Sequence, residues 1–120
     1  MVERLYHVWF STKARKEALQ GELGDDAQRA GIRLLEVEVA VDHVHLLVAL
    51  AEGQTLPSVM HQLKGATARS VFLKYPELKS DLRHNSFWQK GYGSRRLDPS
   101  EVPGVRRYMR TQGATPLRHI

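Results

Sequence analysis

Two histidines separated by one residue, in the sequence Asp42-His43-Val44-His45, form the most informative pair in the chain. In a β-strand, residues two apart point to the same face, so His43 and His45 would project side by side. Neutral imidazoles at this spacing can bind one divalent cation, provided that a third ligand comes from elsewhere. The alternative is that the two histidines occur together by chance, since a surface strand accepts such a pair without a functional role. The aliphatic neighbours favour a functional role, because two histidines among them cost packing energy.

A second set of reactive side chains lies near the C-terminus, in the sequence Tyr108-Met109-Arg110-Thr111-Gln112. Positions four apart stack on one face of a helix, so Tyr108 and Gln112 would point the same way. The tyrosine is flanked by three basic residues, Arg106, Arg107 and Arg110. A phenol, an amide oxygen and guanidinium groups together suit a phosphodiester ligand. The alternative is a helix that packs Tyr108 and Met109 into the core, with the arginines outside.

Aromatic and basic residues are interleaved over residues 87–96. On a strand this mixture suits single-stranded nucleic acid, which binds by base stacking and by charge. The candidate nucleic-acid contacts in this segment are Lys90, Tyr92, Arg95 and Arg96. The segment also begins like the signature of the RNA recognition motif, but the residues after Gly93 break the match. The alternative is a core strand that buries Phe87 and Trp88.

The remaining candidates are few. His7 either lines the sheet near the histidine pair or is a strand residue satisfied by local hydrogen bonds, and the second interpretation is favoured. The chain has no cysteine, which excludes disulfides, a thiol nucleophile and cysteine-based metal sites. We find no Gly-rich phosphate loop, no Ser-His-Asp arrangement and no paired carboxylates near an apolar cleft. The sequence therefore gives no support to a nucleotide-cofactor enzyme, a serine hydrolase or a glycosidase.

Size and charge set the wider limits. The 120 residues, with 42% hydrophobic and 26% charged side chains, predict a single globular domain over residues 1–120. Residues 1–60 carry 6 Lys/Arg against 9 Asp/Glu, whereas residues 61–120 carry 12 against 4. The basic half would face a polyanion or form an idle solvated surface. Without a signal pattern or a long apolar run, we expect a cytoplasmic protein with no membrane contact.

Hydrophobic periodicity gives the elements that must position these side chains. Strands are expected at residues 5–10, 34–41, 43–50 and 87–97, and helices at 13–31 and 56–75. Acidic residues alternate along 34–41, which predicts one wet face, and a bend is expected at Gly91 or Gly93. Asp98 and Glu101 resemble a capping box that would start a last helix; the alternative is a start at Pro103, and Gly113 and Pro116 end the helix. The order β-α-β-β-α-β matches the α+β ferredoxin-like fold, an antiparallel sheet with helices on one face, plus an extra C-terminal helix.

These motifs, in this order, resemble those of the single-tyrosine HUH transposases, the TnpA type found in small bacterial insertion sequences. Residues 42–48 resemble the HUH motif, and residues 107–112 resemble the Tyr-x-x-x-Gln helix of that family. Residues 5–13, 63–65 and 88–92 give supporting matches, so that the resemblance covers about residues 4–112. The motifs resemble those of the REP-associated tyrosine transposases almost as closely.

The resemblance implies a site and a reaction. His43, His45 and Gln112 would bind one Mg²⁺ or Mn²⁺, and Tyr108 would be the nucleophile. The enzyme would cleave and rejoin single-stranded DNA bearing a hairpin through a 5′-phosphotyrosine, as a homodimer in a bacterial or archaeal cell, without a nucleotide cofactor. The alternative is a non-catalytic module that binds single-stranded nucleic acid through Trp88, Tyr92 and the arginines.

Overall fold

The architecture comes from a computed structural model that describes residues 3–11, 16–40, 43–76 and 91–114. Its elements are β1 (Arg4–Ser11), α1 (Lys16–Arg29), β2 (Arg33–Val39), β3 (His43–Leu50), α2 (Leu56–Lys74), β4 (Gly93–Leu97), the 3-10 turn η1 (Pro99–Glu101) and α4 (Val102–Ala114). This order agrees with the one predicted from the sequence.

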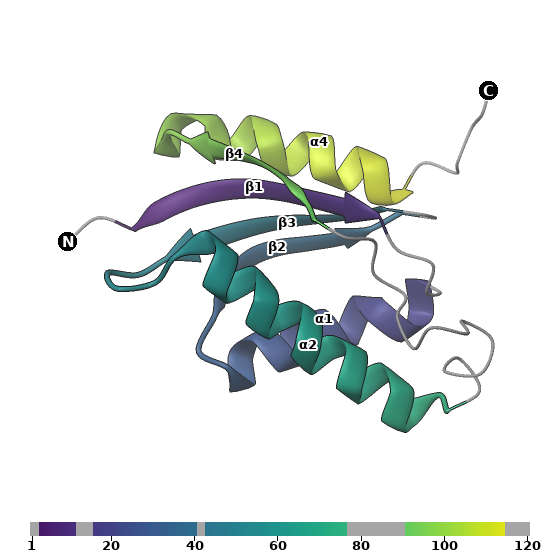
Figure 1. Cartoon of the computed structure of the whole chain (residues 1–120). Coiled ribbons are helices and arrows are strands. Elements are labelled where there is room, and N and C mark those ends of the chain that lie inside the picture. Colours follow the sequence, from purple (N-terminus) through teal and green to yellow (C-terminus); the bar gives the residue numbers. More distant parts are fainter. Residues whose placement is uncertain (1–2, 12–15, 41–42, 77–90, 115–120) are drawn as a thin grey trace.

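The four strands form one antiparallel sheet in the order β2-β3-β1-β4. Helices α1 and α2 cover one face of the sheet, and α4 lies along the other (Figure 1). The structure therefore confirms the ferredoxin-like α+β fold with an additional C-terminal helix. Because β1 and β3 lie in the centre of the sheet, their alternate side chains enter two different layers.

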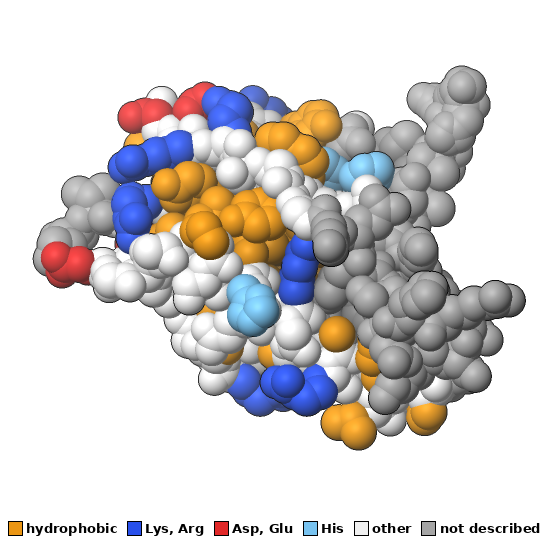
Figure 2. Space-filling view, in the orientation of Figure 1, with side chains coloured by type: hydrophobic (Ala, Val, Ile, Leu, Met, Phe, Trp, Pro, Cys, Tyr) orange, Lys and Arg blue, Asp and Glu red, His pale blue; other side chains and the backbone are white. Residues whose placement is uncertain are grey.

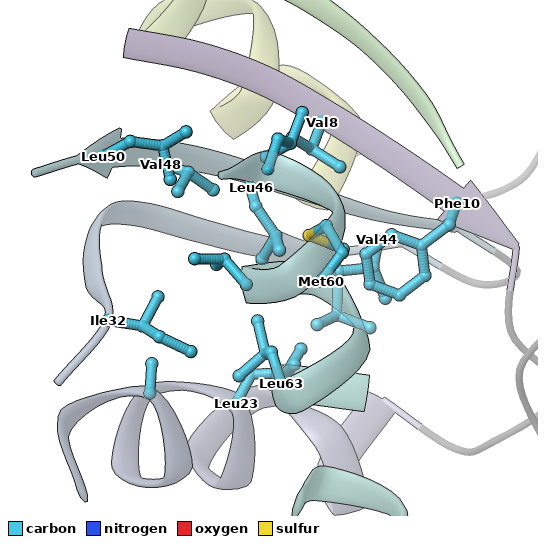
Figure 3. Packing of buried hydrophobic residues seen from close by; sticks show 14 of the residues in the cluster. Val8, Phe10, Leu23, Ile32, Val44, Leu46, Val48, Leu50, Met60 and Leu63 are labelled. Atoms are coloured by element: carbon cyan, nitrogen blue, oxygen red, sulfur yellow. The ribbon is translucent and has the colours of Figure 1, made fainter. Parts of the chain in front are cut away.

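The main hydrophobic core fills the layer between the sheet and the helices α1 and α2 (Figure 3). Even-numbered residues of β3 point into this layer and are completely or almost completely buried: Val44, Leu46, Val48 and Leu50. Leu47, on the opposite face of β3, is also fully buried because α4 covers it. Coverage on both faces explains why β3 after its first residues is apolar without alternation.

A smaller cluster holds α4 on the sheet. It consists of Leu47, Leu97, Val105 and Met109. The same helix covers the acidic face of β2, where Glu36 lies opposite Leu47 and its side chain is 14% exposed. The prediction of a wet face on this strand is therefore wrong. Alternation identifies a polar face but not the element that packs over it.

Strand β4 is shorter than predicted. The expected strand over residues 87–97 begins at Gly93 in the described structure, and residues 87–90 lie outside the described residues. Gly91, one of the two positions at which a bend was predicted, has a φ of 79°, a conformation that favours glycine. A side chain at position 93 would collide with the indole of Trp9, its partner on β1. Gly93 therefore permits close contact between this indole and the edge strand.

The start of α4 follows the predicted capping box. The Asp98 carboxylate accepts a hydrogen bond from the Ser100 amide at 3.0 Å, and Glu101 accepts one from the Asp98 amide at 2.8 Å. One 3-10 turn precedes the α-helix, which continues to Ala114, one residue beyond the predicted end at Gly113. In the ranges that the structure describes, no helix is both long enough and apolar enough to cross a bilayer.

Candidate active site

The histidine pair lies on the face of the sheet that α4 covers. His43 and His45 alternate with core residues on β3, so both project to the side of Leu47 and Met109. His45 is 7% exposed, and His43, at the end of the strand, is half-buried. Ser11 on β1 lies opposite His43 in the pairing of β1 with β3, and its Oγ atom is 3.3 Å from His43 Nε2.

A third histidine completes the cluster. His7 on β1 is 8% exposed, and its Nε2 atom lies 3.1 Å from His45 Nδ1. The two rings are nearly parallel, at 18°, with centroids 5.4 Å apart. The sequence favoured a strand residue away from the pair, and this preference is wrong, because the structure places His7 beside His45. The missing signal was the register between β1 and β3, which pairs Trp9 with His45 and brings His7 next to it.

The environment of His45 and His7 favours the neutral form of both rings. Burial, followed by the neighbouring His7 and His43, lowers the pKa of His45 to about 4. Burial, followed by the positive charge of Arg95, lowers the pKa of His7. At neutral pH both rings are therefore mainly unprotonated and neutral, and the neutral imidazole is the form that binds metal ions.

Tyr108 lies beside the histidines and is open to solvent on its other side. Its side chain is 49% exposed, whereas the adjacent Met109 is fully buried against the sheet. The Tyr108 ring meets His45 edge-on, with centroids 5.8 Å apart, and meets His7 edge-on at 6.0 Å. The alternative prediction placed both Tyr108 and Met109 in the core. It is wrong for Tyr108 and correct for Met109. A phenol that is both positioned and accessible can reach an external substrate.

The predicted third ligand, Gln112, lies on α4 one turn after Tyr108. Its side chain is outside the part of the structure that is described. Among the described residues, no group of three or more His, Cys, Asp or Glu side chains could hold a metal ion. A cation held by His43 and His45 would therefore need a ligand of another type, and an amide oxygen would meet this need.

Two of the arginines predicted to flank the tyrosine are bound to one carboxylate. Arg110 Nε lies 3.1 Å from Glu36 Oε2, and Arg106 Nε lies 3.9 Å from Glu36 Oε1. Arg106 also donates to the Leu35 carbonyl at 3.3 Å. These contacts tie α4 to β2, so Arg106 and Arg110 reach a phosphate only by sharing or leaving Glu36.

The other predicted DNA contacts divide between the two faces of the sheet. Arg95 points to the side of α4 and donates to Glu101 at 3.0 Å, and Arg107 is exposed on α4. Arg96 and Tyr92 lie on the side of the sheet that α1 and α2 cover. Arg96 is opposite Tyr6 in the register of β4 with β1, and Tyr92 packs against the main core. Lys90 lies outside the described residues. Arg95 and the arginines of α4 therefore lie on the side of the sheet that carries Tyr108, whereas Arg96 and Tyr92 lie on the opposite side.

Fold and site together define a small α+β protein with a histidine and tyrosine cluster between a sheet and its C-terminal helix. Residues 2–112 match the family model described as "Transposase IS200 like". The chain belongs to this family of transposases.

Two similar proteins are also named as transposases. The ISDra2 transposase TnpA of Deinococcus radiodurans is 31% identical over 115 residues, which cover 89% of this chain and 82% of that protein. The IS200 transposase of Salmonella typhimurium is 30% identical over 95 residues, and the match covers 72% of this chain and 62% of that protein. This chain therefore spans less than two thirds of the IS200 protein.

Two solved structures have a similar fold. A crystal structure described as a transposase from Deinococcus radiodurans R1 has a TM-score of 0.71 and 27% identity, with 96% of this chain and 95% of that chain covered. A REP-associated tyrosine transposase bound to a REP hairpin has a TM-score of 0.58 and 11% identity, with 93% and 66% covered. At that identity the second likeness concerns the fold alone.

Proposed function

We propose that this IS200-like transposase is a metal-dependent strand transferase that uses Tyr108 to cleave and rejoin single-stranded DNA. The observation that carries the proposal is the cluster of Tyr108 with His45 and His7, with His43 on the same face of β3. A solvent-accessible phenol beside neutral imidazoles is a suitable arrangement for a nucleophile next to a cation site.

The proposed reaction exchanges one phosphodiester for another. The Tyr108 oxygen attacks the scissile phosphorus and loses its proton, while the bond from phosphorus to the 3′ oxygen breaks and that oxygen takes up a proton. The product is a 5′-phosphotyrosine and a free 3′-hydroxyl. A second 3′-hydroxyl then attacks the phosphotyrosine, which releases Tyr108 and joins a new strand. Because one ester replaces another, no nucleotide cofactor is required.

His43, His45 and Gln112 would hold the cation, Mg²⁺ or Mn²⁺. When bound, such an ion polarises the phosphate and offsets the negative charge that develops during attack. The donor set fits a divalent cation in part: His43 and His45 offer imidazoles on one face of β3, and the described residues contain no group of three His, Cys, Asp or Glu side chains that could hold the ion without another ligand. The chain's own contribution is to hold these side chains and the phenol on rigid elements.

The proposed substrate is single-stranded DNA carrying a hairpin, and the proposed assembly is a homodimer. The resemblance of residues 42–48 and 107–112 to the single-tyrosine HUH motifs supports both. A hairpin complex of a protein with the same fold is consistent with this substrate. The surplus of basic residues in residues 61–120 suits any nucleic-acid backbone.

Cleavage of labelled single-stranded hairpin DNA in the presence of Mn²⁺ tests the proposal. Tyr108→Phe should abolish cleavage while DNA binding stays within about threefold, and EDTA should abolish cleavage by the wild type. Tyr75→Phe is the matched control and should still cleave, because Tyr75 lies at the end of α2 and packs against the main core, away from Tyr108. Binding without metal-dependent cleavage in all these proteins would favour the non-catalytic binding module instead.

A further inference from the structure

His7 is a buried polar residue beside the proposed cation ligand His45, and the proposed reaction does not itself use it. It lies on β1, one strand away from the histidine pair, and projects to the same side of the sheet as His45. Its Nε2 atom is at hydrogen-bond distance, 3.1 Å, from His45 Nδ1. The ring also contacts Tyr108 edge-on. His7 thus touches both a proposed ligand and the proposed nucleophile.

The hydrogen bond between the two imidazoles has two possible directions, and they have different consequences. A neutral imidazole carries one proton, on one of its two nitrogens. If His7 Nε2 donates, His45 Nδ1 is the acceptor and His45 Nε2 carries the proton, so it has no lone pair for a cation. If His45 Nδ1 donates, His45 Nε2 keeps its lone pair. Only the second direction is compatible with metal binding through Nε2 of His45.

We propose that His7 is a positioning residue: its Nε2 accepts the Nδ1 proton of His45, so that His45 presents Nε2 to the cation. This inference rests on the proposed function, because it assigns a role next to the proposed cation site. Histidine ligands generally need such an outer partner, which fixes both the tautomer and the ring orientation. The near-parallel rings and the burial of both side chains hold this pair in a single arrangement.

His7 also packs against the ring of the proposed nucleophile, Tyr108. The centroids of the His7, His45 and Tyr108 rings lie 5.4 to 6.0 Å from one another, so each ring supports the other two. His7 therefore limits the positions that the phenol can adopt beside His45. A substitution that keeps the ring but removes the acceptor nitrogen separates this packing role from the tautomer role.

The tautomer can be measured on the wild-type protein without metal or DNA. Long-range ¹H–¹⁵N correlation spectra of histidine-labelled protein report which ring nitrogen carries the proton. We expect His45 to be protonated at Nδ1 and His7 to be unprotonated at Nε2. A His45 that is protonated at Nε2 and accepts at Nδ1 would overturn the proposal, whatever the DNA cleavage assay shows.

Metal affinity gives the second readout. Mn²⁺ is titrated into each protein, and the electron paramagnetic resonance signal of the free ion is followed. His7→Phe keeps a ring but removes the acceptor, and should weaken Mn²⁺ binding about 10- to 100-fold. His7→Gln places an acceptor oxygen near the same point and should restore affinity to within about threefold of wild type. His61→Phe, an exposed histidine on α2, is the matched control and should leave affinity unchanged.

The outcomes separate this inference from the proposed function. Wild-type affinity in His7→Phe would show that His7 has no positioning role, even with the cation site intact. Equal loss in His7→Phe and His7→Gln, with unchanged thermal unfolding, would also contradict it. Mn²⁺ binding that survives replacement of both His43 and His45 by Ala would instead refute the cation site itself, and with it the proposed function.

Discussion

The indole ring of Trp9 packs directly over Gly93, its partner in the pairing of β1 with β4. Gly93→Ala would place a methyl group inside this ring, so the edge strand must shift. We expect a loss of about 1–3 kcal/mol in the free energy of unfolding, measured by urea denaturation. Gly65→Ala on α2 is the control, because a methyl group there meets no atom within 4 Å. It should raise stability by about 0.5–1 kcal/mol, and a similar loss in both variants would refute the argument.

The buried, neutral His45 makes stability depend on pH. Its pKa is lowered to about 4 in the folded protein, so between pH 6.5 and 4 the unfolded chain binds a proton that the folded protein does not. Stability is then unaffected by His45 above pH 6.5 and falls by up to about 3 kcal/mol as the pH drops to 4. Urea denaturation of metal-free protein at several pH values measures this slope. His45→Gln should reduce the slope, with His7 contributing the remainder, and His61→Gln should leave it unchanged; a wild-type slope in His45→Gln would contradict the assignment.

Glu36 on β2 forms ion pairs with both Arg106 and Arg110, and these are the main polar contacts between α4 and the sheet among the described residues. Glu36→Gln removes the charge, so we expect faster amide hydrogen exchange along α4 and a loss of about 0.5–1.5 kcal/mol in stability. Glu22→Gln is the matched control, since Glu22 also has a 14% exposed side chain and binds Lys74 in the opposite layer. Exchange in α4 that is equally fast in both variants would show that Glu36 does not hold the helix.

At the level of elements, the sequence predicted most of the fold because each strand and helix carries its own periodic pattern. The bounds of β3 agree with those predicted, since apolar residues and histidines fill it from end to end. The acidic face of β2 was misjudged because the pattern does not contain the position of α4, which returns from far along the chain. The shared face of His43 and His45 follows from alternation. The contact of His7 with His45 depends on strand register, which one sequence does not reveal.

Over the whole molecule, basic residues outnumber acidic ones, with a formal net charge of +5. On the face seen in Figure 2 the Lys and Arg side chains are spread over several elements and do not form one continuous patch. We therefore expect DNA affinity to come from separate phosphate contacts, each of which contributes about 0.7 to the slope of log affinity against log salt for a single strand. The total slope counts these contacts.

The slope also tests single residues. Arg107→Gln, at an exposed position on α4 next to Tyr108, should reduce the salt slope for single-stranded DNA by about 0.7 and weaken binding to all sequences alike. Lys74→Gln is the control, because Lys74 is paired with Glu22 in the layer on the far side of the sheet. Fluorescence anisotropy at several salt concentrations provides the measurement. Equal slopes for wild type and Arg107→Gln would place the DNA away from α4.

The central claim is that Tyr108 forms a covalent bond to DNA, and intact-protein mass spectrometry tests it most directly. The protein is incubated with Mn²⁺ and a pool of single-stranded hairpin DNA, and its mass is then measured. We expect an increase equal to the mass of a DNA fragment, mapped to Tyr108 by peptide analysis and absent from Tyr108→Phe. An adduct that persists in Tyr108→Phe, or no adduct while the wild type cleaves the same DNA, would contradict the claim.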